Sequence, residues 1–162
     1  MKDPLEIKYD DDYIRKILEN TKTIAIVGLS ENENRPSFFA AKYLKSKGYK
    51  IIPVNPITNK KEILGFRVYK NLEEIDVTPD MVDLFVNPKK VVPFVKQAIK
   101  IKTKVIWMQI GVINYKASQL LKKTKIDLIM DRCPKIEYAR LSGQLSWAGV
   151  NTKIIHNKIN TL

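Results

Sequence analysis

The 162-residue sequence contains a single cysteine, Cys133, and a single histidine, His156. One cysteine excludes a scaffold held together by disulfides, and one cysteine with one distant histidine provides too few ligands for a zinc site. No apolar run approaches the ~20 residues that a membrane-spanning helix needs, and residues 1–12 lack the apolar segment of a signal peptide. We therefore expect a cytoplasmic protein without a metal site or a membrane partner.

Arginine is also scarce, although the chain is strongly basic. The net charge is +12, yet only five of the 29 cationic residues are arginine. Residues 84–130 hold ten lysines against one acidic residue, Asp127, and such a field attracts anions. Nucleic-acid-binding proteins use arginine for bidentate contacts to bases, so we favour a small phosphorylated ligand over nucleic acid. The alternative is that most of these lysines are solvated side chains on helix faces.

Hydrophobic residues make up 44% of the chain and charged residues 28%, which is the balance of one ordinary globular domain. Five short apolar runs show no alternation with polar residues, a pattern typical of strands that are buried on both faces of a sheet. These runs span residues 23–27, 50–54, 81–86, 104–108 and 126–130. Residues 66–69 favour a short sixth strand.

Segments with the period of an amphipathic helix separate the apolar runs. Residues 10–20 form such a segment before the first strand, and Pro36 and Gly48 are typical of the start and end of the next helix. Residues 91–99 carry an apolar stripe, and Asn114 is placed to cap a further helix. Strands that alternate with helices predict an α/β fold with a doubly wound parallel sheet.

The loop after the first predicted strand is a candidate anion site. An open parallel sheet binds ligands beyond the carboxyl ends of its strands, and residues 28–37 lie there, leading into a helix. Gly28 allows a tight turn, Ser30 and Ser37 offer hydroxyl groups, and Arg35 offers a guanidinium group beside the positive end of the helix. The alternative is an ordinary turn with a solvent-exposed arginine.

This loop does not match the nicotinamide-dinucleotide fingerprint. Ser30 and Glu33 occupy the positions of its second and third glycines, and the second strand ends in Asn55 and Pro56 without the acidic residue that would bind a ribose hydroxyl. NAD is therefore disfavoured. A nucleotide phosphorylated on its ribose fits better, and Lys60 is placed to meet a 3′-phosphate, unless it is a solvated charge in a polar loop.

Two further strand ends carry candidate ligand contacts. Phe85 and Val86 form an apolar wall suited to an adenine ring, next to Val91 at the start of a helix. Gln109 follows another strand, and its amide can both donate to and accept from an amide-bearing arm such as pantetheine. Core packing explains Phe85 equally well.

Several motifs together resemble the small single-domain CoA-binding proteins, whose fold is shared with the N-terminal CoA-binding domain of the succinyl-CoA synthetase α subunit. The resemblance covers residues 12–142 and rests on the sequences IVGLS at 26–30, RPS at 35–37, YKIIPVNP at 49–56, VDLF at 82–85, VIWMQIGV at 105–112 and MDRCPKIE at 130–137. It implies a Rossmann-like domain over residues 1–142, including an N-terminal helix, and leaves residues 143–162 as a tail of unknown structure. Apolar residues of the tail, Trp147, Val150, Ile154 and Ile155, suggest a surface for a second copy of the chain.

The resemblance also implies that the chain binds CoA. It places the diphosphate at residues 28–37, the adenosine between Asn55-Pro56 and Phe85-Val86, and the pantetheine past Gln109. The implied cofactor-binding residues are Gly28, Leu29, Ser30, Arg35, Pro36, Ser37, Asn55, Pro56, Lys60, Phe85, Val86, Val91 and Gln109. The synthetase uses a phosphorylated histidine from a second domain, whereas His156 lies in the tail, beyond the resemblance.

A non-catalytic CoA or acyl-CoA binding module is the function we favour, working alone, as an oligomer or with a separate catalytic subunit. The alternative is an NAD(P)-dependent or acyl-CoA-transforming enzyme, for which Asp131 is the sole candidate proton-transfer residue near Gln109. Cys133 follows the last strand at the ligand edge, and we consider it for disulfide exchange with the thiol of CoA. The simpler interpretation of Cys133 is a buried structural cysteine.

Overall fold

The computed structural model describes residues 7–148 and contains one main sheet of five parallel strands. The strands are β1 (Thr23–Val27), β2 (Lys50–Val54), β5 (Met81–Leu84), β6 (Val105–Met108) and β7 (Asp127–Ile129), in the spatial order β2-β1-β5-β6-β7. All five correspond to predicted strands, and the doubly wound α/β fold is confirmed. No described helix combines the length and apolar character needed to cross a bilayer.

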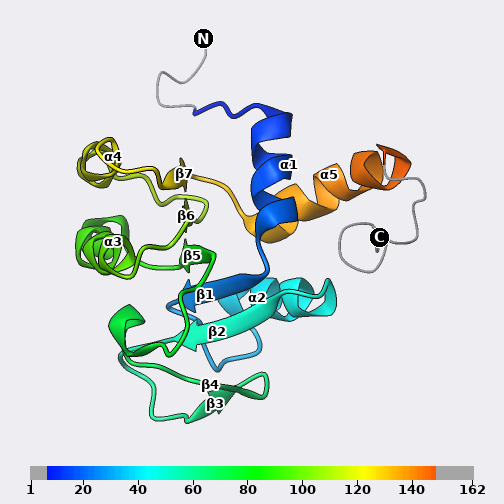
Figure 1. The fold of residues 1–162 in the computed structure, drawn as a ribbon. Helices are drawn as coiled ribbons and strands as arrows, with labels where there is room; N and C mark the ends of the chain where they lie inside the picture. Colours follow the sequence, from blue (N-terminus) through cyan, green and yellow to red (C-terminus); the bar gives the residue numbers. More distant parts are fainter. Residues whose placement is uncertain (1–6, 149–162) are drawn as a thin grey trace.

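Helices cover both faces of the sheet (Figure 1). One face carries α1 (Asp11–Asn20), α2 (Pro36–Ser46) and α5 (Pro134–Ala148), and the other carries α3 (Val91–Lys100) and α4 (Tyr115–Leu121). In β1, Ile24 and Ile26 pack with the first group, while Ala25 and Val27 pack with the second. Because side chains alternate between the two faces, a strand that is covered on both sides is mainly apolar on both.

The helix boundaries follow local chemistry that the sequence displays. Asp10 caps α1 by accepting a hydrogen bond from the Asp12 N–H, Pro36 is the first residue of α2, and Asn114 caps α4 by accepting from the Ala117 N–H. Helix α5 continues through residue 142, where we expected the domain to end. Residues 149–162, with His156 and three of the four apolar tail residues, lie outside the described part of the chain.

The predicted sixth strand does not join the main sheet. Residues Phe66–Arg67 form β4, which pairs antiparallel with β3 (Glu62–Ile63) in a separate two-stranded sheet. Leu64 and Gly65 connect them with φ values of 55° and 80°, and a two-residue turn with both φ angles positive reverses the chain into a hairpin. The segment therefore pairs with the residues just before it, and only Tyr69 bridges to Val54 of the main sheet.

The strand order places a ligand crevice between two particular strands. The chain runs from β1 outward to β2, then returns to the other side of β1 to form β5, β6 and β7. The connections on either side of this switch point leave in opposite directions, so the segments that follow β1 and β5 diverge and open a crevice. The residues that come directly after these two strands are Gly28 and Phe85.

Candidate functional site

Gly28 fixes the base of the crevice through its close approach to the neighbouring strand. Its N–H donates to the Val54 carbonyl at 2.8 Å, and the Phe85 N–H donates to the Val27 carbonyl at 2.9 Å. Gly28 has a φ of +84°, and a Cβ atom at this position would lie 2.2 Å from the Phe85 carbonyl oxygen. Only glycine avoids both the strained φ and this clash.

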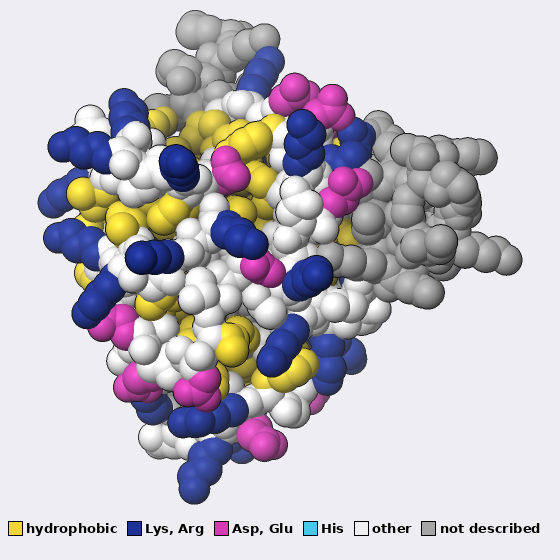
Figure 2. All heavy atoms as spheres, viewed as in Figure 1, with side chains coloured by type: hydrophobic (Ala, Val, Ile, Leu, Met, Phe, Trp, Pro, Cys, Tyr) yellow, Lys and Arg dark blue, Asp and Glu magenta, His cyan; other side chains and the backbone are white. Residues whose placement is uncertain are grey.

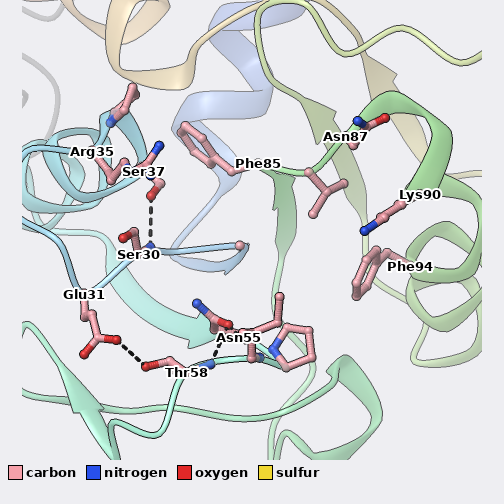
Figure 3. Close-up of a pocket in the computed structure, with 15 residues that line it drawn as sticks. Ser30, Glu31, Arg35, Ser37, Asn55, Thr58, Phe85, Asn87, Lys90 and Phe94 are labelled. Carbon is pink, nitrogen blue, oxygen red and sulfur yellow. Dashed lines mark hydrogen bonds between the residues drawn. The ribbon is translucent and has the colours of Figure 1, made fainter.

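Gly28 is part of the wall of a cavity of about 710 Å³, whose lining residues are drawn in Figure 3. Three segments that follow β1, β2 and β5 line it. They contribute Gly28, Ser30, Glu31, Arg35, Pro36 and Ser37; Asn55, Pro56, Ile57 and Thr58; and Phe85, Val86, Asn87, Lys90 and Phe94. A volume of this size is in the range of small-molecule and cofactor sites.

Hydrogen bonds hold the loop between β1 and α2 in one shape. The buried Ser37 accepts a hydrogen bond from the Ser30 N–H at 3.0 Å, and the Ser30 hydroxyl oxygen accepts from the Asn32 N–H at 3.0 Å. Arg35 precedes α2 without a side-chain hydrogen bond to its first turn. The guanidinium group of Arg35 is thus available at the cavity, beside the positive end of an 11-residue helix.

Asn55 holds the segment after β2, which forms another wall of the cavity, in place by hydrogen bonds. Its side-chain amide donates to the Leu29 carbonyl at 2.9 Å, and its side-chain oxygen accepts from the N–H groups of Ile57 and Thr58 at 2.9 and 3.1 Å. Thr58 in turn donates to the Glu31 carboxylate at 2.8 Å (Figure 3). The segments after β1 and β2 are therefore joined across the cavity by side chains.

We expect Asn55→Ala to lower the free energy of unfolding by about 1–3 kcal/mol, because partly buried backbone groups lose their partners. Asn55→Asp loses the donor to the Leu29 carbonyl but keeps the acceptor for Ile57 and Thr58, so it should cost less stability than Asn55→Ala, while its negative charge should weaken the binding of an anion. Chemical denaturation of both variants measures the stability. Equal destabilisation by the two changes would contradict this role of the Asn55 oxygen.

A second cavity of about 490 Å³ continues from the first along the same edge of the sheet. The two cavities share four wall residues, and the second adds residues that follow β6 and β7. The shared residues are Pro36, Phe85, Val86 and Asn87, and the added ones are Gln109, Ile110, Val112, Cys133 and Ile136. The side-chain oxygen of the buried Gln109 has no hydrogen-bond donor among the described residues.

The structure brings most of the predicted site residues to the two cavities, with three exceptions. Leu29 and Val91 are fully buried in the two hydrophobic clusters and line neither cavity, although the Leu29 carbonyl accepts the bond from Asn55. Lys60 lines a separate cavity of about 320 Å³ beside Glu31 and Glu33. A role of Lys60 in binding a phosphate stays a prediction.

Six residues of the first cavity were not among the predicted cofactor-binding residues: Glu31, Ile57, Thr58, Asn87, Lys90 and Phe94. Lys90 ends the short 3₁₀ turn Pro88–Lys90, and Phe94 lies one turn into α3 (Figure 3). The pair Lys89-Lys90 is visible in the sequence, but the direction of the turn decides which of them faces the cavity. The sequence contains one signal for this turn, the pair Asn87-Pro88, which is typical of a turn before a helix.

Asp131 has a structural role in the described geometry. It has a φ of 61°, its side chain accepts a hydrogen bond from the Gly111 N–H at 2.8 Å, and it lies 3.9 Å from the Arg132 guanidinium group. The carbonyl of Arg132 accepts from the Trp107 indole at 2.9 Å. These contacts join the loops after β6 and β7.

Within residues 7–148, no group of three acidic, histidine or cysteine side chains could hold a metal ion.

Comparison with known proteins agrees with this geometry. A family model described as a CoA binding domain matches residues 22–139, which contain both cavities. The chain belongs to this CoA-binding domain family. The resemblance inferred from the sequence motifs is thereby confirmed at the level of the family.

Individual relatives of this CoA-binding domain are similar over most of its length. The uncharacterized protein YneT of Bacillus subtilis is 36% identical over 126 residues, 78% of this chain and 92% of that protein. A hypothetical protein from Pyrococcus horikoshii superposes with a TM-score of 0.80 and 37% identity, over 87% of this chain and 99% of that one. An ADP-forming acetate–CoA ligase of Methanocaldococcus jannaschii is 34% identical over 82 residues, 51% of this chain but only 11% of the ligase.

Proposed function

We propose that the protein binds CoA along the carboxyl edge of its sheet, as a non-catalytic binding module. The observation that carries this proposal is the pair of adjoining cavities, which share four wall residues, at the switch point between β1 and β5. The first contains two cationic side chains, Arg35 and Lys90, and the second has apolar walls around the unpartnered Gln109 oxygen. This sequence of environments matches a molecule with a phosphorylated nucleotide at one end and a neutral amide chain at the other.

Each part of CoA finds a suitable partner in this arrangement. The diphosphate would lie at residues 28–37, where the missing Cβ of Gly28 leaves room and Arg35 supplies charge. The adenosine would lie between Asn55-Pro56 and Phe85-Val86. The pantetheine would cross the shared wall, and one of its amide N–H groups would supply the donor that the Gln109 oxygen lacks.

Two contacts favour binding over catalysis. Asp131, the sole candidate for proton transfer, holds Gly111 and Arg132, and Glu31, the acidic residue of the first cavity, accepts from Thr58. The matching part of the acetate–CoA ligase is a small portion of a much longer protein, so we propose that this chain works with a separate catalytic chain or as an oligomer. A cytoplasmic location stays a prediction.

Thermal unfolding with added nucleotides tests the function. A ligand at one hundred times its dissociation constant adds about 2.7 kcal/mol to stability, so saturating CoA should raise the melting temperature while NAD should not. Stabilisation by NAD but not CoA would overturn the proposal in favour of a dehydrogenase.

Nucleic acid binding would appear as retention on DNA that weakens steeply with salt. Figure 2 shows acidic side chains interspersed among the lysines and arginines of the viewed face.

We expect Lys90→Ala to weaken CoA binding by about tenfold, because a charge-assisted contact to a phosphate is lost. Lys60→Ala is the matched control, since it removes the same charge from a side chain outside the first cavity. Isothermal titration calorimetry of both variants measures the difference. A larger loss from Lys60→Ala would assign the ribose phosphate to Lys60, as the sequence suggested, and would contradict the phosphate contact that we propose for Lys90.

A further inference from the structure

The second cavity is lined by the one cysteine of the chain, Cys133. This residue lies immediately before α5, and its carbonyl accepts a hydrogen bond from the Glu137 N–H at 3.0 Å. The backbone of Cys133 is thereby fixed within the first turn of the helix. The cysteine is 8% exposed and lines the cavity together with Gln109, Ile110 and Ile136.

Gln109 is an independent sign that this cavity receives a ligand. It is more than nine-tenths buried, it lines the same cavity as Cys133, and its side-chain oxygen has no donor among the described residues. An unpartnered polar atom of this kind costs stability unless a ligand or water completes it. The oxygen is itself buried, so a rotation of the Gln109 side chain would bring it to an amide N–H of a ligand whose sulfur atom lies near the cysteine.

The shared walls limit which sulfur compounds reach Cys133 in this orientation. Phe85 and Val86 border both cavities, so a molecule anchored by its phosphates near Arg35 extends over them toward Cys133. A disulfide that carries a nucleotide is therefore held in place before it reacts, whereas a small disulfide has no anchor. Prior positioning of two reacting groups accelerates their reaction.

We propose that Cys133 exchanges with disulfides of CoA and forms a mixed disulfide with it, an inference that rests on the proposed CoA binding. The Cys133 thiol gives its proton to solvent, and the thiolate attacks the CoA sulfur of a disulfide CoA–S–S–R. The Cys133–CoA S–S bond forms as the original S–S bond breaks, and the leaving RS⁻ takes up a proton. One disulfide replaces another, so the step needs no further oxidant.

The single cysteine determines the fate of the mixed disulfide. Cys133 is the sole cysteine of the chain, so no second thiol of the same molecule can displace the CoA. The mixed disulfide would persist until an external thiol reduces it, which returns free CoA and the Cys133 thiol. The site would thus hold CoA covalently when disulfides of CoA accumulate and release it when thiols are restored.

Intact-protein mass spectrometry under non-reducing conditions tests this inference, with CoA disulfide and glutathione disulfide as probes. CoA disulfide should add one CoA group to the full-length protein at least about tenfold faster than glutathione disulfide adds glutathione, and dithiothreitol should remove it. The adduct can form only at Cys133, so the wild-type chain suffices to locate it, and Cys133→Ser should give none. Excess desulfo-CoA, which has no thiol and so cannot reduce the mixed disulfide, should slow the reaction with CoA disulfide by occupying the anchor.

The outcomes separate the inference from the proposed function. Binding itself is measured on the wild-type protein by the thermal shift that reduced CoA produces in excess dithiothreitol, where no disulfide forms. A thermal shift with no CoA adduct, or with equal rates for the two disulfides, would overturn the exchange and leave CoA binding intact. Absence of the thermal shift would contradict the proposed function itself.

Discussion

Replacement of Gly28 by alanine is expected to lower the free energy of unfolding by about 3 kcal/mol and to abolish the binding of CoA. Two costs combine at this position. The φ of +84° is strained for any residue with a Cβ, and that Cβ would lie 2.2 Å from the Phe85 carbonyl oxygen. Because Phe85 borders both cavities, the shift that relieves the clash changes the shape of the site.

Gly65→Ala is the matched control for Gly28→Ala. Gly65 has a similar φ of +80°, but a Cβ there would meet no atom within 4 Å. We expect a loss of about 1 kcal/mol from backbone strain alone and unchanged CoA affinity, because Gly65 lies in the β3–β4 turn, outside both cavities. Urea denaturation and calorimetry measure the two effects. Equal losses of stability for the two variants would show that the contact with Phe85 is unimportant.

Asp83 is expected to make the protein less stable as the pH rises. It lies in the middle of β5, in register with Ile26 and Trp107, and is fully buried. Neither carboxylate oxygen has a hydrogen-bond partner among the described residues, and the Trp107 indole donates to Arg132 instead. Burial therefore raises the pKa of Asp83 well above its usual value of 3.8.

The sign of the pH effect is set by this raised pKa. Below pH 3.8 the carboxyl group is mainly neutral in both the folded and the unfolded chain, so its ionisation hardly changes the free energy of unfolding. As the pH rises toward the folded-state pKa, the unfolded chain releases the proton first, and stability falls. Asp83→Asn cannot ionise, so it should match the wild type at low pH and exceed it by a margin that grows as the pH rises toward the folded-state pKa of Asp83.

Asp80 provides a control of opposite sign. Burial raises its pKa, but hydrogen bonds from the N–H groups of Lys22 and Thr23 and the charge of Lys104 lower it by more, so that the net shift is downward. Asp80→Asn should destabilise the protein at neutral pH, with the difference disappearing as the pH falls through the lowered pKa of the wild type. Denaturation from about pH 2 to pH 8 compares all three proteins, so that the scan reaches below the lowered pKa of Asp80. A wild type that gains stability relative to Asp83→Asn with rising pH would show that Asp83 has an ionic partner.

The fold was predictable because its signals are local. Five uninterrupted apolar runs indicated the parallel strands, and Pro36 and Asn114 indicated the starts of two helices. The sixth strand was misplaced because its partner depends on the φ angles of Leu64 and Gly65. Leucine seldom adopts a positive φ, so no residue pattern before Gly65 pointed to the hairpin.

The site was predictable where a residue directly follows a strand, as with Gly28, Asn55, Phe85 and Gln109, because the topology brings all strand ends to one edge. It was less predictable in the longer connections. The 3₁₀ turn before α3 presents Lys90 to the cavity, while the longer loop after β2 carries Lys60 past it. Side-chain direction in such segments depends on tertiary contacts, which no local pattern encodes.

A crystal structure of the protein with CoA would decide whether the ligand lies in the two cavities. We expect electron density for the diphosphate beside Arg35 at the start of α2, for the adenine against Phe85 and Val86, and for a pantetheine amide on the Gln109 oxygen. CoA bound at any other surface, or cavities that stay empty at saturating CoA, would contradict the proposed site.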